Sequence, residues 1–452
     1  MNTLKVCKKI AELVSEKNGR VYFVGGYVRD KLLNHESKDY DIEVHGIEPN
    51  DLGDILNKVG KKIQYGKDFG VYSLVGHNID IAMPRKEKQR GTGHKDFDIF
   101  VDPYIGTKKA AIRRDFTINS LMEDVLTGEI IDHFNGQDDL KNKIIRHVNS
   151  ETFQEDALRV LRACQFASRF EYTIDPSTLE LCKKMDLSHL SKERVFDEMA
   201  KALLKANKPS IFFNYLREMN HLDYWFKELV PLIGCPQNPI YHKEGDVWNH
   251  TMMVLDEGAK LRSKAKEPLF FMISCLCHDL GKPLATESID GVIHSYYHEI
   301  KGMDVANEFL LRLTNSKSLI KYTLNMIKLH MRPATLCFDK ASYKASNKLF
   351  DETYYPEDLI LLVLADSKGM IKETPYLDFE DELYDRLNHY KEIIARPRVT
   401  GEDLLNNGIK EGKIFKELLK YSFNLHLKEV DKESSLKQTL NYYQELLNKN
   451  KG

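Results

Sequence analysis

The sequence has almost no net charge, and this limits how it can recognise a partner. Its 66 lysines and arginines are offset by 68 aspartates and glutamates, for a formal net charge of -2. A chain-wide basic field, which attracts nucleic-acid phosphates from a distance, is therefore excluded. Any contact with a nucleic acid must come from local groups of lysine and arginine.

Long apolar runs and paired cysteines are also missing. No stretch reaches the roughly 18 apolar residues that a membrane-spanning helix needs, and the lysine-interrupted N-terminus does not read as an export signal. The seven cysteines are scattered, odd in number and without C-x-x-C spacing, which argues against a disulfide framework or a zinc knuckle. We therefore expect reduced thiols, a cytoplasmic location and no membrane contact.

The chain does have enough apolar sequence for several cores. Hydrophobic residues make up 42% of its 452 residues, and a chain of this length usually folds as two to four domains. Short β-type runs between glycine turns predict an α+β domain on a small sheet at the start, and apolar spacings of three and four predict helices afterwards. The expected domains are residues 1–150 (α+β), 151–239, 240–370 and 371–452 (all helical). The expected strands are VYFVGG from 21, DYDIEV from 39, VYSLV from 71, NIDIAM from 78 and EIIDHF from 129.

Acidic side chains are predicted to gather on one face of this sheet. Strand alternation in DYDIEV places Asp39, Asp41 and Glu43 together, away from the intervening residues. In NIDIAM, Asp80 lies between two isoleucines and points away from the apolar face. Carboxylates projecting from neighbouring strands form a hard-oxygen site for Mg²⁺, and Asp39, Asp41 and Asp80 fit a two-metal phosphoryl-transfer centre. The alternative is that these side chains merely face water.

A glycine turn precedes the acidic strand. The segment VYFVGGYVRDKLL reads as a strand, a turn at Gly25 and Gly26, and a helix that carries Arg29. The two glycines permit close approach of the backbone to a triphosphate, and the helix N-terminus adds a favourable dipole. A Gly-Gly pair alone is a weak signal, but its position before the acidic strand favours a nucleotide site.

The order of these and later segments resembles the DNA polymerase β-like nucleotidyltransferase superfamily, in the branch that holds CCA-adding enzymes and bacterial poly(A) polymerases. The matching segments run from about residue 20 to residue 205. They are GGYVRD, KDYDIEV, IDIAMPRKE, IRRDFTINSLM, IDHFNGQDDLKNKIIRHV, FQEDALRVLRACQFASRF and SKERVFDEMAKALL. The resemblance implies a polymerase β-like head in residues 1–150 and a helical neck in 151–239 that recognises the base and binds RNA.

The resemblance also assigns nucleotide-binding residues. Arg113, Arg114 and Asp115 form the family motif that holds the sugar and helps to exclude deoxynucleotides, because guanidiniums clamp phosphates and a carboxylate accepts a ribose hydroxyl. A basic start of a surface helix is the alternative for either arginine alone. The full set of expected nucleotide-binding residues is Gly25, Gly26, Arg29, Arg113, Arg114, Asp115, Asn119, Asp156, Arg159 and Arg162.

Two of these residues are expected to read the base. If QEDALRVLRA is one helix, Asp156 and Arg159 lie three residues apart on one face. Such a pair matches the amino donor and ring-nitrogen acceptor that cytosine and adenine share, and leaves unpaired groups against uracil and guanine. The resemblance gives the pair this role; an ordinary helix salt bridge is the alternative. The polar segment between Met83 and Ile112, with Gly91, Gly93 and Gly106, is expected to be a mobile loop that in the family helps to switch from C to A addition.

A second constellation lies between residues 240 and 370, where histidines recur beside acids. Imidazoles and carboxylates from separate helices suit a divalent transition metal, and the adjacent His278 and Asp279 can bridge two ions. One histidine alone is more often an ordinary side chain, whereas six candidates in order predict a site. The candidates are His250, His278, Asp279, His298, His330 and Asp366.

This set resembles the HD phosphohydrolase superfamily. His250, Asp366 and the His278-Asp279 pair match its core ligands, and the other two histidines match those of two-metal members. The resemblance implies metal-assisted hydrolysis of a phosphate ester. HD domains attached to CCA-adding enzymes act on 2',3'-cyclic and terminal phosphates, which repairs an RNA end. A structural or RNA-binding role is the alternative.

Together the resemblances predict an enzyme that adds C, C and A to the 3' end of tRNA from CTP and ATP, joined to an HD phosphohydrolase. Its expected cofactors are Mg²⁺ at the first site and a divalent transition metal at the second. Poly(A) synthesis, or addition of only CC or only A, remains open because these activities share the motifs. A hydrolase whose head only binds nucleotide is a further alternative, and a non-catalytic RNA-binding protein fits two metal sites poorly.

Overall fold

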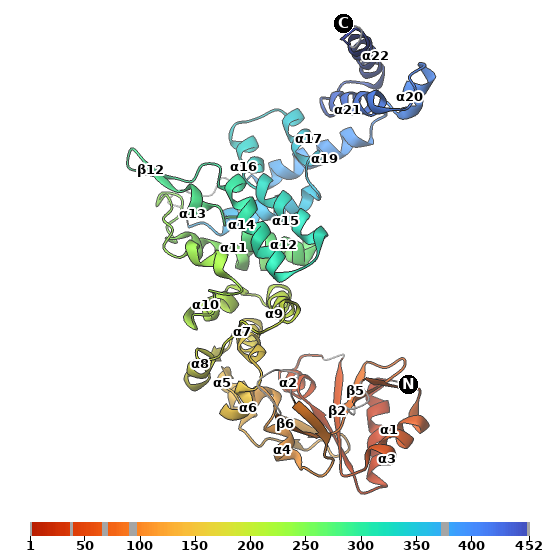
Figure 1. Cartoon of the computed structure of the whole chain (residues 1–452), viewed down its shortest axis with the longest axis vertical. Helices are drawn as coiled ribbons and strands as arrows, with labels where there is room; N and C mark the ends of the chain where they lie inside the picture. Colours follow the sequence, from red (N-terminus) through yellow and green to blue (C-terminus); the bar gives the residue numbers. More distant parts are fainter. Residues whose placement is uncertain (1, 37–38, 66–70, 90–96, 372–378, 450–452) are drawn as a thin grey trace. The chain divides into compact units, whose positions relative to one another are not determined.

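The chain forms two compact units in the computed structural model (Figure 1). The structure describes residues 2–36, 39–65, 71–89, 97–371 and 379–449. Unit 1 comprises Met1–Ala202 and Ile211–Tyr224, and unit 2 comprises Leu203–Ser210 and Trp225–Gly452. The finer division into four domains stays a prediction.

Unit 1 is built on a mixed sheet of seven strands in the order β3-β4-β5-β2-β1-β8-β9. Strand β2 runs parallel to β5 and antiparallel to β1. All five expected β-type runs contribute to this sheet, although the last one supplies only two residues, so the α+β head is confirmed. The strands are β1 (Arg20–Val24), β2 (Tyr40–His45), β3 (Lys62–Tyr65), β4 (Val71–Leu74), β5 (Ile79–Ala82), β8 (Met122–Asp124) and β9 (Ile130–Ile131).

Helices α1 (Thr3–Ser15) and α3 (Pro49–Val59) lie beside the sheet (Figure 1). Helix α1 contacts α3, β1 and β2, and its apolar stripe is fully buried. Along β2, Ile42 and Val44 are buried apolar residues, and alternation places Asp41, Glu43 and His45 on the opposite face. Strand β2 thus presents one apolar face for packing and one polar face for chemistry.

The prediction of a loop between Met83 and Ile112 is wrong at both ends of this segment. Strands β6 (Arg85–Gln89) and β7 (Phe97–Val101) pair antiparallel, and α4 (Thr107–Ala111) follows. The polar composition and the glycines suggested a loop, but DFDIFV begins with alternating polar and apolar residues and ends in an apolar run, and both are strand signals. Gly91 and Gly93 lie outside the described residues.

The remainder of unit 1 is helical, as expected, apart from a two-residue parallel pair. Its elements are α2 (Gly26–Leu32), the 3₁₀ helix η1 (Thr117–Asn119), α5 (Gly136–Asn142), β10 (Ile144–Ile145), α6 (Ser150–Gln154), α7 (Leu158–Phe170), β11 (Thr173–Ile174), α8 (Pro176–Cys182), α9 (Lys192–Lys205) and α10 (Ser210–Glu218), the last two extending into the second unit.

Unit 2 packs around α12 (Pro268–Cys277), an almost entirely apolar helix that contacts α11, α15 and α18. A short hairpin, β12–β13, interrupts the region that was expected to be all helical. The elements after Trp225 are η2 (Lys227–Leu232), α11 (Val247–Leu261), η3 (Arg262–Lys264), α13 (Lys282–Ala285), β12 (Glu287–Ile289), β13 (Val292–His294), α14 (His298–Leu313), α15 (Lys317–Leu329), α16 (Met331–Phe338), α17 (Tyr343–Asp351), α18 (Pro356–Lys368), α19 (Glu380–Ala395), α20 (Gly401–Asn406), α21 (Lys413–Leu427) and α22 (Lys432–Lys449).

Two whole-chain features complete the fold. All seven cysteines lie in the described ranges, and each is buried and unpaired. Across the same ranges, no helix combines the length and the apolar character required to cross a membrane.

Candidate active site and candidate metal centre

Asp41 and Asp80 are register partners on adjacent parallel strands, β2 and β5. Register partners lie about 4.8 Å apart and point to the same face. Asp39 immediately precedes β2, and its carboxylate accepts a hydrogen bond from Asn78, two residues before Asp80. The structure therefore brings the three predicted carboxylates to one end of two neighbouring strands.

The electrostatics of Asp41 fit a bound cation. Burial raises the pKa of Asp41 above its usual value, and the nearby charges of Asp80 and Asp39 raise it further, while Arg114 opposes the shift. Ionisation is thus disfavoured by the surroundings, and a divalent cation would relieve that penalty. The donors are all carboxylate oxygens, which suit a hard ion such as Mg²⁺.

The glycine turn lies directly against this site. Gly25 has φ 65°, a conformation that a side chain would strain. A Cβ there would lie 3.6 Å from a guanidinium nitrogen of Arg114 and 3.8 Å from Oδ2 of Asp41. The turn before α2 therefore brings the backbone close to Asp41 and Arg114, and the expected approach of this turn to a triphosphate stays a prediction.

Four of the predicted nucleotide-binding residues form a network behind the turn. Arg29, which is 3% exposed, donates to Asn119 Oδ1 at 2.6 Å, and Asn119 donates to Asp115 Oδ1 at 3.0 Å. Arg162 pairs with Asp115 Oδ2 at 2.6 Å. The network joins α2, η1 and α7. Arg29 and Asp115 are buried and already paired. They are therefore placed to support the site from behind as well as to contact a ligand directly.

Replacing Asp115 with asparagine tests that support. Burial would raise the pKa of Asp115, but Arg162 and Asn119 hold it below its usual range. The ionised carboxylate therefore stabilises the fold above the unfolded pKa of about 3.9, and this contribution is lost as pH falls below that value. We expect the substitution to lower the free energy of unfolding at pH 7 by about 2–3 kcal/mol, less than for a fully buried pair because Arg162 is 33% exposed. Urea unfolding at pH 7 and pH 3 measures this, and the difference from wild type should shrink at pH 3. An equal difference at both values would contradict it.

The predicted placement of Asp156 beside Arg159 on one helix is wrong. Helix α6 ends at Gln154 and α7 begins at Leu158, so Asp156 lies between the two helices. Its Oδ1 accepts the backbone N–H of Leu158 at 3.0 Å, and its Oδ2 pairs with Arg194 of α9 at 2.7 Å. A carboxylate that bonds the backbone two residues ahead competes with helix formation at its own position.

Arg159 is held by backbone carbonyls instead. It donates to the carbonyl of Thr152 at 2.5 Å and to that of Arg113 at 2.8 Å. Arg113 itself pairs with Glu155 at 3.2 Å. The predicted residues of the neck and of the Arg113–Asp115 motif are thus connected, with Arg194 as the partner that sequence reasoning missed.

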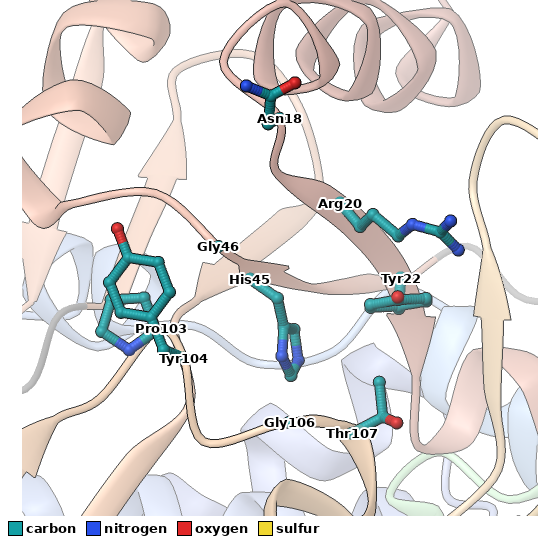
Figure 2. Close-up of a pocket in the computed structure, with 9 residues that line it drawn as sticks. All are labelled: Asn18, Arg20, Tyr22, His45, Gly46, Pro103, Tyr104, Gly106 and Thr107. Carbon is teal, nitrogen blue, oxygen red and sulfur yellow. The ribbon is translucent and has the colours of Figure 1, made fainter.

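A pocket of about 360 Å³ lies elsewhere in unit 1 (Figure 2). Figure 2 shows His45 in its wall, between Tyr22 and the Pro103-Tyr104 segment. None of the predicted site residues lines it: the lining is Asn18, Arg20, Tyr22, His45, Gly46, Pro103, Tyr104, Gly106 and Thr107.

His45 links this pocket to the carboxylate site. Its Nε2 lies 2.7 Å from Glu43 Oε1, and the other oxygen of Glu43 lies 3.4 Å from Arg114. Burial would raise the pKa of Glu43, but His45 and Arg114 hold it below its usual range. Glu43 therefore stays ionised and fixes Arg114 beside Asp41. Strand alternation placed Glu43 on this face, but its partners are set by tertiary contacts.

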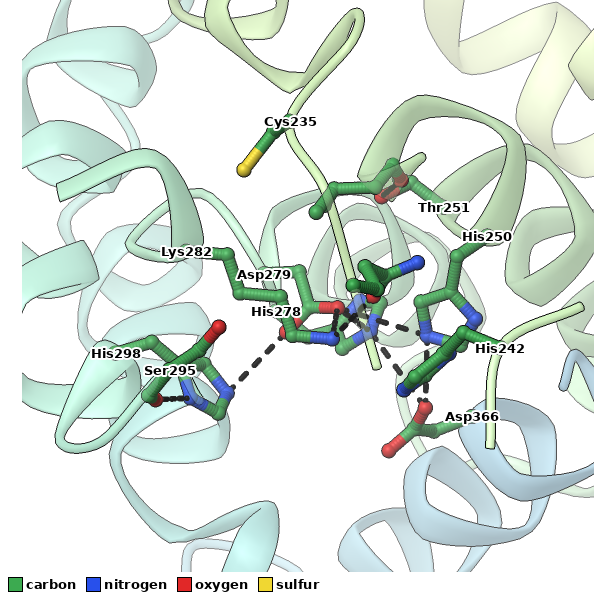
Figure 3. A network of polar contacts seen from close by, with 12 residues as sticks. Cys235, His242, His250, Thr251, His278, Asp279, Lys282, Ser295, His298 and Asp366 are labelled. Atoms are coloured by element: carbon green, nitrogen blue, oxygen red, sulfur yellow. Dashed lines mark hydrogen bonds and ion pairs between the residues drawn. The ribbon is translucent and has the colours of Figure 1, made fainter. Parts of the chain in front are cut away.

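In unit 2, two groups of potential metal ligands share one carboxylate (Figure 3). The first group is His250, His278 and Asp279, and the second is Asp279, His298 and His330, with ligand atoms within 4.8 Å of one another in each. Oδ2 of Asp279 lies 3.2 Å from His278 Nε2, and Oδ1 lies 3.2 Å from His298 Nε2. The structure thus places Asp279 between the two groups, as a bridging ligand would be.

Asp366 completes the first group. Oδ1 of Asp366 lies 3.0 Å from Nε2 of His250, on the side of Asp279 opposite His298 (Figure 3). Most of the other ligands lie at the ends of helices. His278 follows the last residue of α12, His330 follows α15, and His298 begins α14, while Asp366 lies in α18. All six predicted residues are therefore brought together.

Three imidazoles are oriented by their own backbones. Nδ1 of His278 donates to the carbonyl of Cys275 at 2.9 Å, and His298 and His330 likewise donate to the carbonyls three residues before them, at 2.8 and 2.6 Å. A proton on Nδ1 leaves the Nε2 lone pair for a metal, which is how metal-bound histidines are usually held. Within the described residues, buried His278 Nε2 makes no hydrogen bond. These features fit a metal.

The charges at the centre favour a divalent transition metal. Burial would raise the pKa values of Asp279 and Asp366, but the surrounding histidines hold both well below their usual range, and Lys282 adds to the effect on Asp279. Burial lowers the pKa of His330 to about 3, so this imidazole is neutral at pH 7. Burial would also lower the pKa values of His250 and His298, but Asp366 raises the first to about 9 and Asp279 raises the second. A divalent cation would take the place of these protons in a mixed oxygen and nitrogen donor set.

A glycine contact that sequence reasoning missed holds the two groups together. A Cβ at Gly281 would lie 2.0 Å from the carbonyl oxygen of His298 and 2.5 Å from the backbone nitrogen of Gly302.

We expect Gly281→Ala to push α14 away, to lower the free energy of unfolding by about 1–3 kcal/mol through overpacking, and to separate His298 from Asp279. Gly291→Ala is not a matched control because Gly291 has φ 79°; Gly412→Ala, where a Cβ meets nothing within 4 Å, is suitable. Thermal unfolding measures the effect, and an unchanged midpoint for Gly281→Ala would contradict it.

Comparisons with known proteins find two family matches along the chain. Residues 21–146 match the poly A polymerase head domain family, and residues 171–233 match the family described as the probable RNA and SrmB-binding site of polymerase A. The multifunctional CCA protein of Actinobacillus pleuropneumoniae serotype 5b is 33% identical over 419 residues, covering 89% of this chain and 97% of that protein. The multifunctional CCA protein of Haemophilus ducreyi is 36% identical over 318 residues, covering 69% and 75%.

Solved structures share the fold. The Bacillus stearothermophilus CCA-adding enzyme in complex with CTP is 20% identical, with a TM-score of 0.66 and coverage of 99% of this chain and 100% of that one. The Thermotoga maritima CCA-adding enzyme complexed with tRNA is 20% identical, with a TM-score of 0.62 and coverage of 98% and 99%.

Proposed function

Because this chain belongs to the family of multifunctional CCA proteins, we infer that it is a tRNA nucleotidyltransferase, and we propose that it adds C, C and A to the 3' end of tRNA from CTP and ATP. The observation that carries the proposal is the pairing of Asp41 with Asp80 on adjacent strands, with Gly25 and Arg114 against Asp41. This arrangement offers carboxylates for a metal, an open backbone turn and a guanidinium within one small region.

The residues of the head have separable roles in this proposal. Asp39, Asp41 and Asp80 would hold Mg²⁺, which when bound activates a 3'-hydroxyl and offsets the charge that develops on the transferred phosphoryl group. Arg114, fixed by Glu43, would bind triphosphate oxygens and hold them in line with the hydroxyl. The network behind Gly25 keeps the turn in place.

Base selection would use Asp156 and Arg159 through their observed partners. Asp156 already pairs with Arg194, so we propose that a carboxylate with two nearby guanidiniums forms the surface that pairs with cytosine or adenine. Such a surface accepts an exocyclic amino group and donates to a ring nitrogen, whereas uracil and guanine leave buried groups unpaired.

A primer-extension assay tests this function. Purified protein with Mg²⁺ would be given tRNA transcripts that lack CCA, transcripts that end in CC, and an unrelated RNA, each with labelled CTP, ATP or both. Ordered addition of C, C and A that then stops is the expected result. Addition of A alone to transcripts ending in CC, addition of CC alone, or long A tracts on any RNA would contradict it and identify one of the alternative activities.

We also propose that unit 2 hydrolyses 2',3'-cyclic or terminal phosphates at RNA ends. The two ligand groups that share Asp279 support this activity. Such a centre supplies a strong nucleophile and neutralises the phosphate when divalent metals are bound. Lys282, whose Nζ lies 2.7 Å from Asp279 Oδ2, adds a positive charge at the edge of the site. Conversion of 2',3'-cyclic AMP to adenosine 2'- or 3'-monophosphate after loading with Ni²⁺ or Co²⁺ is the expected result, and no conversion with either metal would contradict it.

A cytoplasmic location is part of the same proposal. Seven buried, unpaired cysteines are what a reducing compartment preserves. The partners we propose are the tRNA 3' end, ATP and CTP.

A further inference from the structure

One imidazole of the metal centre is oriented in a different way from the other three. His278, His298 and His330 each use the backbone carbonyl three residues earlier. His250 lies in the first turn of α11, where the carbonyl of Val247 accepts the hydroxyl of Thr251 instead. Nδ1 of His250 makes no hydrogen bond within the described residues, and the carboxylate beside it is that of Glu244, whose Oε1 lies 3.1 Å away.

Glu244 is well suited to hold an imidazole. Its side chain is only 2% exposed, and its Oε2 accepts the backbone N–H of Ile371 at 2.9 Å. Its Oε1 also lies 2.7 Å from Nδ1 of His242, and the rings of His242 and His250 are 4.9 Å apart in an edge-to-face arrangement. Figure 3 shows His242 beside His250, on the side of Asp366.

The distances favour a hydrogen bond over an ion in this group. His242, Glu244 and His250 are close enough to be considered for a third metal. Two ligands about 2.1 Å from one ion, at tetrahedral or octahedral angles, lie about 3 Å or more apart. The 2.7 Å between His242 and Glu244 is instead an ordinary hydrogen-bond distance. Glu244 therefore accepts a hydrogen bond from His242 and lies at ion-pair distance from Nδ1 of His250, which leaves Nε2 of His250 for the metal.

We propose that Glu244, supported by His242, is a positioning residue of the metal centre that fixes the proton of His250 on Nδ1 and directs its Nε2 to the metal. The inference rests on the proposed hydrolase function of unit 2 and adds two residues that neither the HD resemblance nor the sequence pattern assigned. A carboxylate behind a ligating histidine sets the ring orientation and raises its basicity, and loss of such a partner costs about 10- to 100-fold in metal affinity.

The inference predicts a selective effect because the two ligand groups use different supports. Within the described part of the chain, Glu244 contacts the first ligand group through His250, whereas His298 and His330 of the second group are held by backbone carbonyls. Removal of the carboxylate should weaken one metal equivalent and spare the other. A merely structural role for Glu244 would weaken both or neither.

The test is a titration of metal-free protein with Co²⁺, followed by calorimetry and by the visible absorption of Co²⁺. All proteins carry Asp41→Asn, which weakens the carboxylate site of unit 1. Glu244→Gln, which keeps the side-chain size, is compared with Glu287→Gln, which removes the same charge from the exposed hairpin strand β12. His242→Gln is expected to act in the same direction with a smaller effect, because Ile371 still holds Glu244.

We expect the reference protein and Glu287→Gln to bind two equivalents, and Glu244→Gln to bind one of them about 10- to 100-fold more weakly with an altered absorption spectrum. Unchanged binding by Glu244→Gln, or equal weakening of both equivalents, would overturn the inference while leaving the metal centre intact. If the reference protein binds no Co²⁺, the proposed hydrolase function fails as well. Thermal unfolding of the metal-free variants verifies that they are folded.

Discussion

Asp41→Asn is expected to lower the rate of nucleotide addition by about three orders of magnitude while leaving the protein folded. Asparagine keeps the shape of the side chain but removes the charge that would bind a divalent ion next to Asp80. A loss of about 4 kcal/mol of transition-state stabilisation corresponds to this factor. Hydrolysis by unit 2 should not change, because the substitution touches none of its ligands.

The stability of this variant separates a catalytic role from a structural one. The folded-state pKa of Asp41 is raised, so its ionised form disfavours folding, and this penalty appears as pH rises through the carboxylate range. Asp41→Asn should therefore keep or raise the melting temperature at pH 7. Primer extension and thermal unfolding are measured beside Asp54→Asn, an exposed position on α3. Activity above a tenth of wild type, or a clear drop in melting temperature, would contradict the assignment.

The carboxylate site could be predicted because strand geometry is periodic. Side chains alternate with a period of two, so DYDIEV and NIDIAM each reveal which residues share a face. The parallel pairing of β2 with β5 then placed Asp41 beside Asp80. Local sequence and tertiary pairing point to the same arrangement here.

The base-reading pair could not be predicted in the same way. A helical period placed Asp156 beside Arg159, but the side chain of Asp156 bonds the backbone ahead of it and separates α6 from α7. Short polar residues compete with helices in this manner. The partner that Asp156 does have, Arg194, is 38 residues away in sequence, so no local pattern indicates it.

A similar limit applies to the surroundings of the metal centre. The β12–β13 hairpin had a usable signal in the Asp290-Gly291 pair, a common two-residue hairpin turn, and both residues have positive φ. Glu244 had no such signal in the sequence, because it lies in an irregular segment and is held by the backbone of Ile371, 127 residues later. The series of histidines and acids along the sequence indicated the metal ligands. The residues that hold those ligands in place are set by tertiary contacts, which the sequence pattern does not show.

Asp279→Asn is expected to abolish phosphate-ester hydrolysis and to leave nucleotide addition intact. Asp279 is the one member common to both ligand groups, so its loss removes a donor from each metal. The substitution also leaves the buried Lys282 with Gln237 as its remaining partner. Breaking a buried ion pair in this way typically costs about 3–5 kcal/mol of unfolding free energy, so a loss of activity in this variant alone has two explanations.

His330→Gln removes that ambiguity. His330 is neutral at pH 7 because its pKa is lowered to about 3, so its replacement strands no charge and should change the melting temperature of the metal-free protein little. Hydrolysis of 2',3'-cyclic AMP after Ni²⁺ loading should nevertheless fall at least 100-fold, as with Asp279→Asn. Asp290→Asn, in the hairpin turn where asparagine also tolerates positive φ, is the matched control. If folded His330→Gln still hydrolyses the cyclic nucleotide, the second ligand group takes no part in the reaction. If the same variant loses nucleotide addition, the two activities are not separable.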